Sequence, residues 1–134
     1  MLRFDHPFLM LEFRRRVSGI VPLQSVAGQA AAGFALAILA VHWALIVRFL
    51  VARAGSLSFL RLHYSVAFGV DWVDQWWLLF LFPLLGLATF AINLWLSVQL
   101  ARSRPALGTM LLVATALLEA LFAAGGSFAI LLNS

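Results

Sequence analysis

Three long runs of apolar residues dominate the chain. They cover about residues 28–50, 76–100 and 106–132. Each run exceeds the roughly 20 residues that a helix needs to cross a hydrocarbon core of about 30 Å. The pattern therefore predicts an all-α integral membrane protein with three transmembrane helices, built as a single membrane domain over residues 1–134.

The segment before the first run, residues 1–23, has the pattern of an interfacial helix. Asp5 is a suitable N-cap, and Pro7 stands in the first turn, where a missing N–H costs nothing. Leu9, Phe13 and Val17 then fall on one face. We expect an amphipathic helix in the headgroup plane of the bilayer. Docking of this helix against the cytoplasmic surface of a partner is the alternative.

Residues 51–75, between the first two runs, follow a different pattern. Every even position from Leu62 to Trp72 is apolar, and every odd position between them is polar or small. This period of two is typical of a strand, and a lone strand must meet water, fold into a hairpin or add to a partner's sheet edge. An interfacial helix is the alternative, because apolar residues also recur every four positions. We expect an extended or irregular outer loop.

Aromatic residues gather in this loop and at the start of the second run. They are Tyr64, Trp72, Trp76 and Trp77. Trp and Tyr concentrate at membrane–water interfaces, where the ring is apolar and the polar tip meets headgroups. We expect these four residues to anchor the chain at the outer interface.

The composition supports the membrane class. Apolar residues make up 64% of the 134 residues and charged residues 10%, whereas an ordinary soluble domain is about 45–50% apolar. The absence of cysteine excludes disulfides, thiolate metal sites and cysteine nucleophiles. The net charge of +4 does not indicate a nucleic-acid partner, because the arginines lie near the ends of the apolar runs.

The arginines also predict the orientation. Three spans would place six arginines on one side and three on the other. The larger group is Arg3, Arg14, Arg15, Arg16, Arg102 and Arg104, and the smaller is Arg48, Arg53 and Arg61. The positive-inside rule then puts the N-terminus and the 101–105 turn in the cytoplasm, and the 51–75 loop and the C-terminus outside. We expect a multi-pass protein of the inner (cytoplasmic) membrane.

Each run also contains a polar residue whose burial needs an explanation: His42, Asn93 and Glu119. A charged residue at mid-membrane costs about 2.5–3.5 kcal/mol on insertion scales. Counted from the cytoplasmic ends of their runs, His42 and Glu119 lie at nearly the same depth. A contact between them would satisfy both and could hold a proton near neutral pH. Asn93 lies closer to the cytoplasm and suits an interhelical hydrogen bond.

Three interpretations of these polar residues stay open. They stabilise helix packing, they form a proton or ligand site, or they contact another subunit. The sequence also predicts a kink at Pro83. At Gly125 and Gly126 it predicts either a looser outer half of the third helix or room for a bulky neighbour. Small residues that permit close helix approach are Gly28, Ala32 and Ala35 in the first run and Ala116, Ala120 and Ala124 in the third.

Motifs for catalysis are missing from the chain. It has no phosphate loop, nucleophile elbow, zinc signature or dinucleotide fingerprint. Asp71, Asp74 and His63 share the outer loop and are expected to be solvated or to cap turns. A haem b site would need paired transmembrane histidines, and His42 alone lies in a predicted span. We therefore expect no metal and no cofactor, with haem b or a quinone at His42 as the alternative.

Two resemblances add to this picture. Ala101-Arg102-Ser103-Arg104-Pro105, followed by Leu118-Glu119-Ala120-Leu121, resembles the basic loop and proton-carrying carboxylate of the ATP synthase rotor c-subunit. The chain departs from that family because its second run has no glycine ladder and an additional span comes first. A second resemblance, to small uncharacterised three-span bacterial membrane proteins, covers most of the chain. It is carried by Leu62-His63-Tyr64, Phe68-Gly69-Val70-Asp71, Trp77, Pro83, Gly86-Leu87, Asn93-Leu94 and Asn133.

These observations favour a non-catalytic protein. Small-residue faces, intramembrane polar groups and a strand-like loop suited to a partner's sheet are typical of an accessory or scaffold subunit of a larger membrane assembly. We expect the lipid bilayer and other membrane subunits, or further copies of the chain, as partners. The alternative is a proton-handling or haem- or quinone-binding membrane subunit that uses Glu119 and His42.

Overall fold

The computed structural model describes residues 25–53 and 59–134. The predicted interfacial helix over residues 1–23 lies outside these residues. The elements in chain order are α2 (Val26–Ala52), β1 (Phe59–Ser65), β2 (Gly69–Gln75), the 3₁₀-helix η2 (Trp76–Phe80), α3 (Leu81–Ala101) and α4 (Pro105–Leu131). The segments Val26–Ala52, Trp76–Ala101 and Pro105–Leu131 are each long and apolar enough to cross a membrane. The prediction of three such helices is confirmed.

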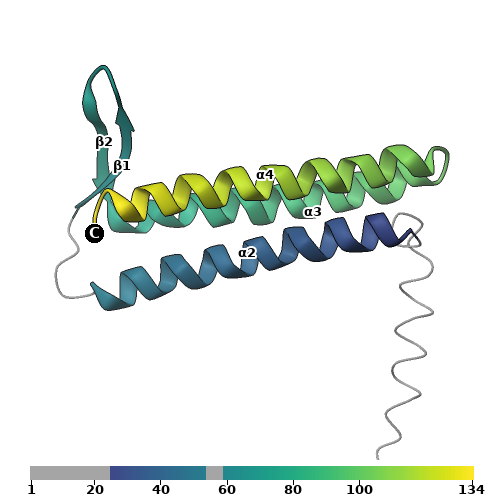
Figure 1. Cartoon of the computed structure of the whole chain (residues 1–134), viewed down its shortest axis with the longest axis horizontal. Helices are drawn as coiled ribbons and strands as arrows, with labels where there is room; N and C mark the ends of the chain where they lie inside the picture. The colour runs from purple at the N-terminus through teal and green to yellow at the C-terminus, as the bar shows by residue number, and fades with distance from the viewer. Residues whose placement is uncertain (1–24, 54–58) are drawn as a thin grey trace, which may run out of the picture.

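The three long helices lie side by side as a bundle (Figure 1). Helix α4 is the member that packs against both others. Helices α2 and α4 run in the same direction, and α3 runs in the opposite one. Helix α4 packs extensively against both neighbours, whereas α2 and α3 touch each other much less. Side chains on α4 are therefore the ones that meet both other helices.

The ends of the helices follow from local sequence. Ser25 caps α2, because its Oγ accepts a hydrogen bond of 2.9 Å from the Gly28 N–H. Pro105 occupies the first turn of α4, where its missing N–H leaves no unmet hydrogen bond. Pro83 lies in the first turn of α3, directly after η2. The predicted kink is therefore replaced by a change from 3₁₀- to α-helix, and the rest of α3 continues unbroken.

The outer loop forms an antiparallel hairpin of β1 and β2. The prediction of extended structure is confirmed, and the interfacial-helix alternative is wrong. The alternation from Leu62 to Trp72 belongs to two strands, because the chain turns between Ser65 and Gly69. Gly69 has a φ of +73°, a left-handed conformation that glycine adopts without strain. The Ser65 hydroxyl also accepts a hydrogen bond from the Phe68 N–H across the turn.

The base of the hairpin is part of the hydrophobic core. Leu60 and Leu62 of β1 are buried in one cluster with residues of three other elements. Those residues are Ile46, Leu50, Leu79 and Ala129. A second cluster, Ala35, Phe90 and Ala116, joins the three helices nearer their middle. Hairpin and bundle are thus one packed unit at this end of the molecule.

Candidate functional site

The polar residues of the bundle interior belong to two groups that differ in hydrogen bonding. His42, Ser97, Thr115 and Glu119 are the buried polar or charged side chains among the described residues. Ser97 and Thr115 are hydrogen-bonded. His42 and Glu119 are 1% and 0% exposed, and neither nitrogen of the one nor oxygen of the other has a hydrogen-bond partner in the described part of the chain.

Asn93 belongs to the hydrogen-bonded group. Its Nδ2 donates to the Thr115 Oγ1 on α4 over 3.0 Å, and the Thr115 hydroxyl donates to the Leu111 carbonyl. One turn nearer the α3–α4 connection, the Ser97 hydroxyl donates to the Gly108 carbonyl over 2.7 Å. The interhelical hydrogen bond predicted for Asn93 is confirmed, and it ties α3 to α4.

This bond makes a testable contribution to stability. We expect Asn93→Leu to lower the free energy of unfolding by about 0.6 kcal/mol, and by at most about 1.7 kcal/mol, the average and the maximum measured for interhelical hydrogen bonds in a membrane protein. Reversible SDS-induced unfolding in bicelles, followed by circular dichroism, measures the change. Ile92→Leu, at the exposed neighbouring position, is the control. Equal stabilities for the two variants would show that the bond contributes nothing.

The buried Glu119 side chain of α4 lies against Gly86 of α3. A Cβ atom built on Gly86 of α3 would lie 3.3 Å from the Glu119 Cδ and 3.1 Å from a terminal methyl carbon of Leu39 on α2. The carboxyl group is thus enclosed by all three helices, and the missing side chain of Gly86 makes room for it. No local sequence signal marks Gly86 for this role.

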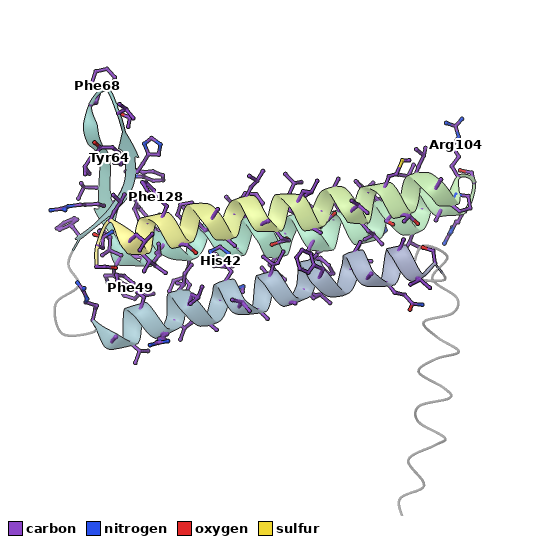
Figure 2. The ribbon with its side chains drawn as sticks, in the orientation of Figure 1. His42, Phe49, Tyr64, Phe68, Arg104 and Phe128 are labelled. Carbon is purple, nitrogen blue, oxygen red and sulfur yellow. The ribbon has the colours of Figure 1, made fainter. Side chains whose placement is uncertain are left out.

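His42 projects from α2 toward α4, where its ring lies against another glycine, Gly126 (Figure 2). A Cβ atom built on Gly126 would lie 3.2 Å from both ring carbons that flank Nε2 and would overlap Nε2 itself. The ring therefore points its Nε2 edge directly at the Gly126 backbone. The predicted room for a bulky neighbour at Gly126 is confirmed. At Gly125 a Cβ would lie 3.0 Å from the Phe82 ring, which confirms the same prediction there.

The predicted contact between His42 and Glu119 is wrong, because no hydrogen bond joins them. The Ser25 and Thr109 hydroxyls lie 3.3 Å apart at one end of the bundle, at a separation of 84 residues. His42 and Gly126 are separated by the same number, so this offset relates α2 to α4 along their length. If α2 and α4 were aligned by the starts of their apolar runs, residues 28 and 106, the offset would be six residues smaller than the observed one. Six residues correspond to about 9 Å along a helix. His42 therefore lies well beyond Glu119 along the bundle.

The two side chains constitute the candidate site. A buried polar group without a hydrogen bond costs about 1–3 kcal/mol, and such groups in folded proteins call for an explanation, often a functional one. Both groups can exchange a proton, and they lie on helices that contact each other. A haem iron at the His42 Nε2 does not fit, because the Gly126 backbone occupies the direction in which that nitrogen would bind a metal.

The predicted interface anchors all lie at the hairpin end of the molecule. Tyr64, Trp72, Trp76 and Trp77 are partly exposed there. The indole N–H of Trp72 donates to Asp74, and that of Trp77 donates to Gln75. Arg104 marks the opposite end of the bundle (Figure 2). The four rings are therefore gathered at one end of the bundle.

One structural residue in this region was not recognised as such from the sequence. Asn133, beyond the end of α4, bonds both backbone groups of Arg61: its Oδ1 accepts from the N–H over 2.9 Å and its Nδ2 donates to the carbonyl over 2.7 Å. A neighbouring strand would bond an edge residue in the same way. Nothing in the local sequence relates two residues that are 72 positions apart.

Comparisons of the chain with protein-family models, with curated proteins and with solved structures give no match. The two resemblances seen in the sequence therefore stay predictions.

Proposed function

We propose that the chain is a non-catalytic accessory or scaffold subunit of a larger membrane protein assembly. The proposal rests on the outer face of α4. Ala116 is 7% exposed and packs inside the bundle, whereas Ala120 and Ala124, from the same predicted small-residue face, are exposed. Helix α4 thus keeps a surface on which another helix can approach closely.

Helix association in lipid depends on such surfaces. Lipid tails are as apolar as leucine, so packing area and close backbone approach drive association, with no hydrophobic gain between helices. Leu117 and Leu121 flank the two alanines and are also exposed. The two alanines thus contribute short side chains to a surface bordered by exposed leucines. A partner subunit or a second copy of the chain would fit it.

The distribution of arginine supports a location in the inner membrane with the Arg102–Arg104 turn in the cytoplasm. The hairpin and the C-terminus then lie on the outer side, together with the four aromatic anchors. This orientation would place the exposed alanines within the membrane, on the half of α4 nearer the outer side.

The proposal predicts a selective effect of a bulky residue on α4. We expect Ala124→Phe to weaken the native assembly at least about tenfold, which corresponds to 1.4 kcal/mol, because the added ring holds the partner helix away. Native mass spectrometry of the tagged chain in nanodiscs prepared from its own membrane measures the assembled fraction. Val41→Phe, at an exposed position of α2, is the matched control.

Two results would contradict the proposal. One is a wild-type chain that is monomeric under these gentle conditions. The other is an equal loss of assembly in both variants, which would point to a general disturbance of the fold. Partners that co-purify with the wild type and with Val41→Phe, but not with Ala124→Phe, would support an assembly through α4.

A second candidate function is proton handling, alone or coupled to a quinone. The observation that favours it is the pair of buried titratable side chains, His42 and Glu119, without hydrogen-bond partners in the described residues. Mere helix packing would be served as well by apolar residues, which carry no desolvation cost. The test is Glu119→Met, a substitution that separates stability from activity.

A further inference from the structure

The hairpin leaves the bundle as an arm whose base is fixed at several points. Leu60 and Leu62 are buried in the core, and Asn133 holds both backbone groups of Arg61. The same Asn133 Nδ2 also donates to the Ala129 carbonyl, so the arm is tied to the last turn of α4. These contacts set the direction in which the strands extend.

That direction is across the helices. Figure 1 shows β1 and β2 running sideways from the end of the bundle, well clear of all three helix axes. Val66 and Phe68 form the tip of the arm, and they are 97% and 84% exposed. Neither side chain has a place in the core. The tip of the arm thus presents apolar side chains to its surroundings at a distance from the bundle.

The lengths of the helices place the arm relative to a membrane. Helices α2 and α4 have 27 residues each, which corresponds to about 40 Å at 1.5 Å per residue. The hydrocarbon core is about 30 Å thick, and the bilayer with its headgroups about 40–45 Å. The ends of helices that span it reach the headgroup layer. An arm that starts there and runs sideways stays within that layer.

The composition of the arm suits the headgroup layer. Tyr64 and Trp72 have apolar rings with polar tips, the combination that concentrates at this depth. Residues 59–75 contain one arginine, Arg61, and two aspartates, Asp71 and Asp74. The arm therefore has no excess of positive charge to attract anionic lipid. The interaction that remains is the burial of apolar side chains among lipids of any headgroup charge.

We propose that the hairpin is a membrane-interface arm, which lies in the headgroup layer beside the bundle and inserts Val66 and Phe68 between lipids. The ligand is the phospholipid headgroup layer itself, whatever the charge of its headgroups. The arm widens the footprint of a small bundle and fixes its tilt and depth, because it resists rotation about axes in the membrane plane. This inference is independent of the accessory-subunit proposal.

The cysteine-free chain permits a direct test by spin labelling in phosphatidylcholine nanodiscs. A nitroxide at Val66→Cys reports its depth through collisions with oxygen, which is concentrated in lipid, and with a nickel chelate, which stays in water. Ser103→Cys in the exposed, arginine-flanked α3–α4 turn and Val41→Cys near the middle of α2 are the polar-turn and lipid references. We expect an oxygen-to-nickel ratio several-fold above that of Ser103→Cys, unchanged when anionic lipid is added.

Two outcomes would overturn the proposal that the hairpin is a membrane-interface arm. A ratio equal to that of Ser103→Cys would show that the tip lies no deeper in lipid than a polar turn at the end of the bundle. Dipolar broadening that grows with the number of chains per disc would show that the tip meets a second copy. Phe68→Cys, labelled in the same way, repeats the measurement at the other tip position. Both readouts require only the folded chain in lipid, so they stay valid whatever becomes of the α4 assembly test.

The tie at Asn133 has its own readout. In the Val66→Cys background, Asn133→Ala is expected to raise the mobility of the tip label and to lower its oxygen-to-nickel ratio. Ser134→Ala removes a hydroxyl that bonds only within the last turn of α4, and it is the matched control. Identical spectra for the two variants would show that Asn133 does not position the arm.

Discussion

Gly126→Ala is expected to lower the free energy of unfolding by about 1–3 kcal/mol, the usual cost of an extra methyl group in a packed core. The added Cβ would overlap the His42 Nε2 and lie 3.2 Å from two further ring atoms. His42 is 1% exposed, so its ring has little space to move into. The helices α2 and α4 must separate, or the ring must leave its rotamer. Unfolding by SDS in bicelles measures the loss.

Two further variants make this prediction specific. Gly33→Ala is the control, because a Cβ at that position meets nothing within 4 Å, and the better helix propensity of alanine should leave it neutral or slightly stabilised. His42→Ala combined with Gly126→Ala should be more stable than the sum of the two single changes implies, since the methyl group enters the space of the ring. Additive losses would contradict the contact between His42 and Gly126.

Glu119→Met is expected to raise the free energy of unfolding by about 1–3 kcal/mol, the cost of a buried polar group that lacks a hydrogen bond. Methionine has the length and the unbranched shape of glutamate, so it fits the space beside Gly86 and Leu39. Were the carboxyl group a bridge to His42, an apolar residue would destabilise the bundle. The structure reverses that expectation, because neither carboxyl oxygen is hydrogen-bonded in the described residues.

Glu119→Gln is the matched control for this change. It keeps the size and a polar end, so its stability should stay near that of the wild type. A loss of stability in Glu119→Met would show that the carboxyl group has a partner in the bilayer. A more stable Glu119→Met protein that no longer supports proton uptake in reconstituted vesicles would favour the proton-handling function. A more stable protein with intact assembly and no proton uptake in the wild type would favour the scaffold.

The number and placement of the long helices could be predicted because the signal is local. A helix satisfies all its backbone groups within one segment, so a long apolar run is enough to specify it in lipid. The predicted runs over residues 28–50 and 106–132 lie close to the observed α2 (Val26–Ala52) and α4 (Pro105–Leu131). The strand pattern after Leu62 was equally local. It predicted extended structure correctly, but the alternation continues through the turn and conceals the boundary between β1 and β2.

The partners of the polar residues could be predicted only in part. Asn93 has a hydrogen bond to α4 as expected, because almost any neighbouring helix can offer a carbonyl or hydroxyl at some depth. A contact between His42 and Glu119 requires a particular offset between α2 and α4 along the bundle. The starts of the apolar runs predict that offset wrongly. Ala116, Ala120 and Ala124 form one predicted small-residue face, and the structure buries Ala116 while it leaves Ala120 and Ala124 exposed. All three helices are apolar around their whole circumference, so composition does not reveal the inward face.

The sequence by itself determined that this protein has three membrane-length helices, an extended segment between the first two, and polar residues within the apolar runs. The tertiary structure decided which of these polar residues are bonded and where the hairpin points. The physical reason is that both depend on close contacts between distant segments. His42 lies against Gly126, Glu119 against Gly86, and Asn133 against Arg61. Such contacts set the offset of one helix against another, and no single segment carries that information.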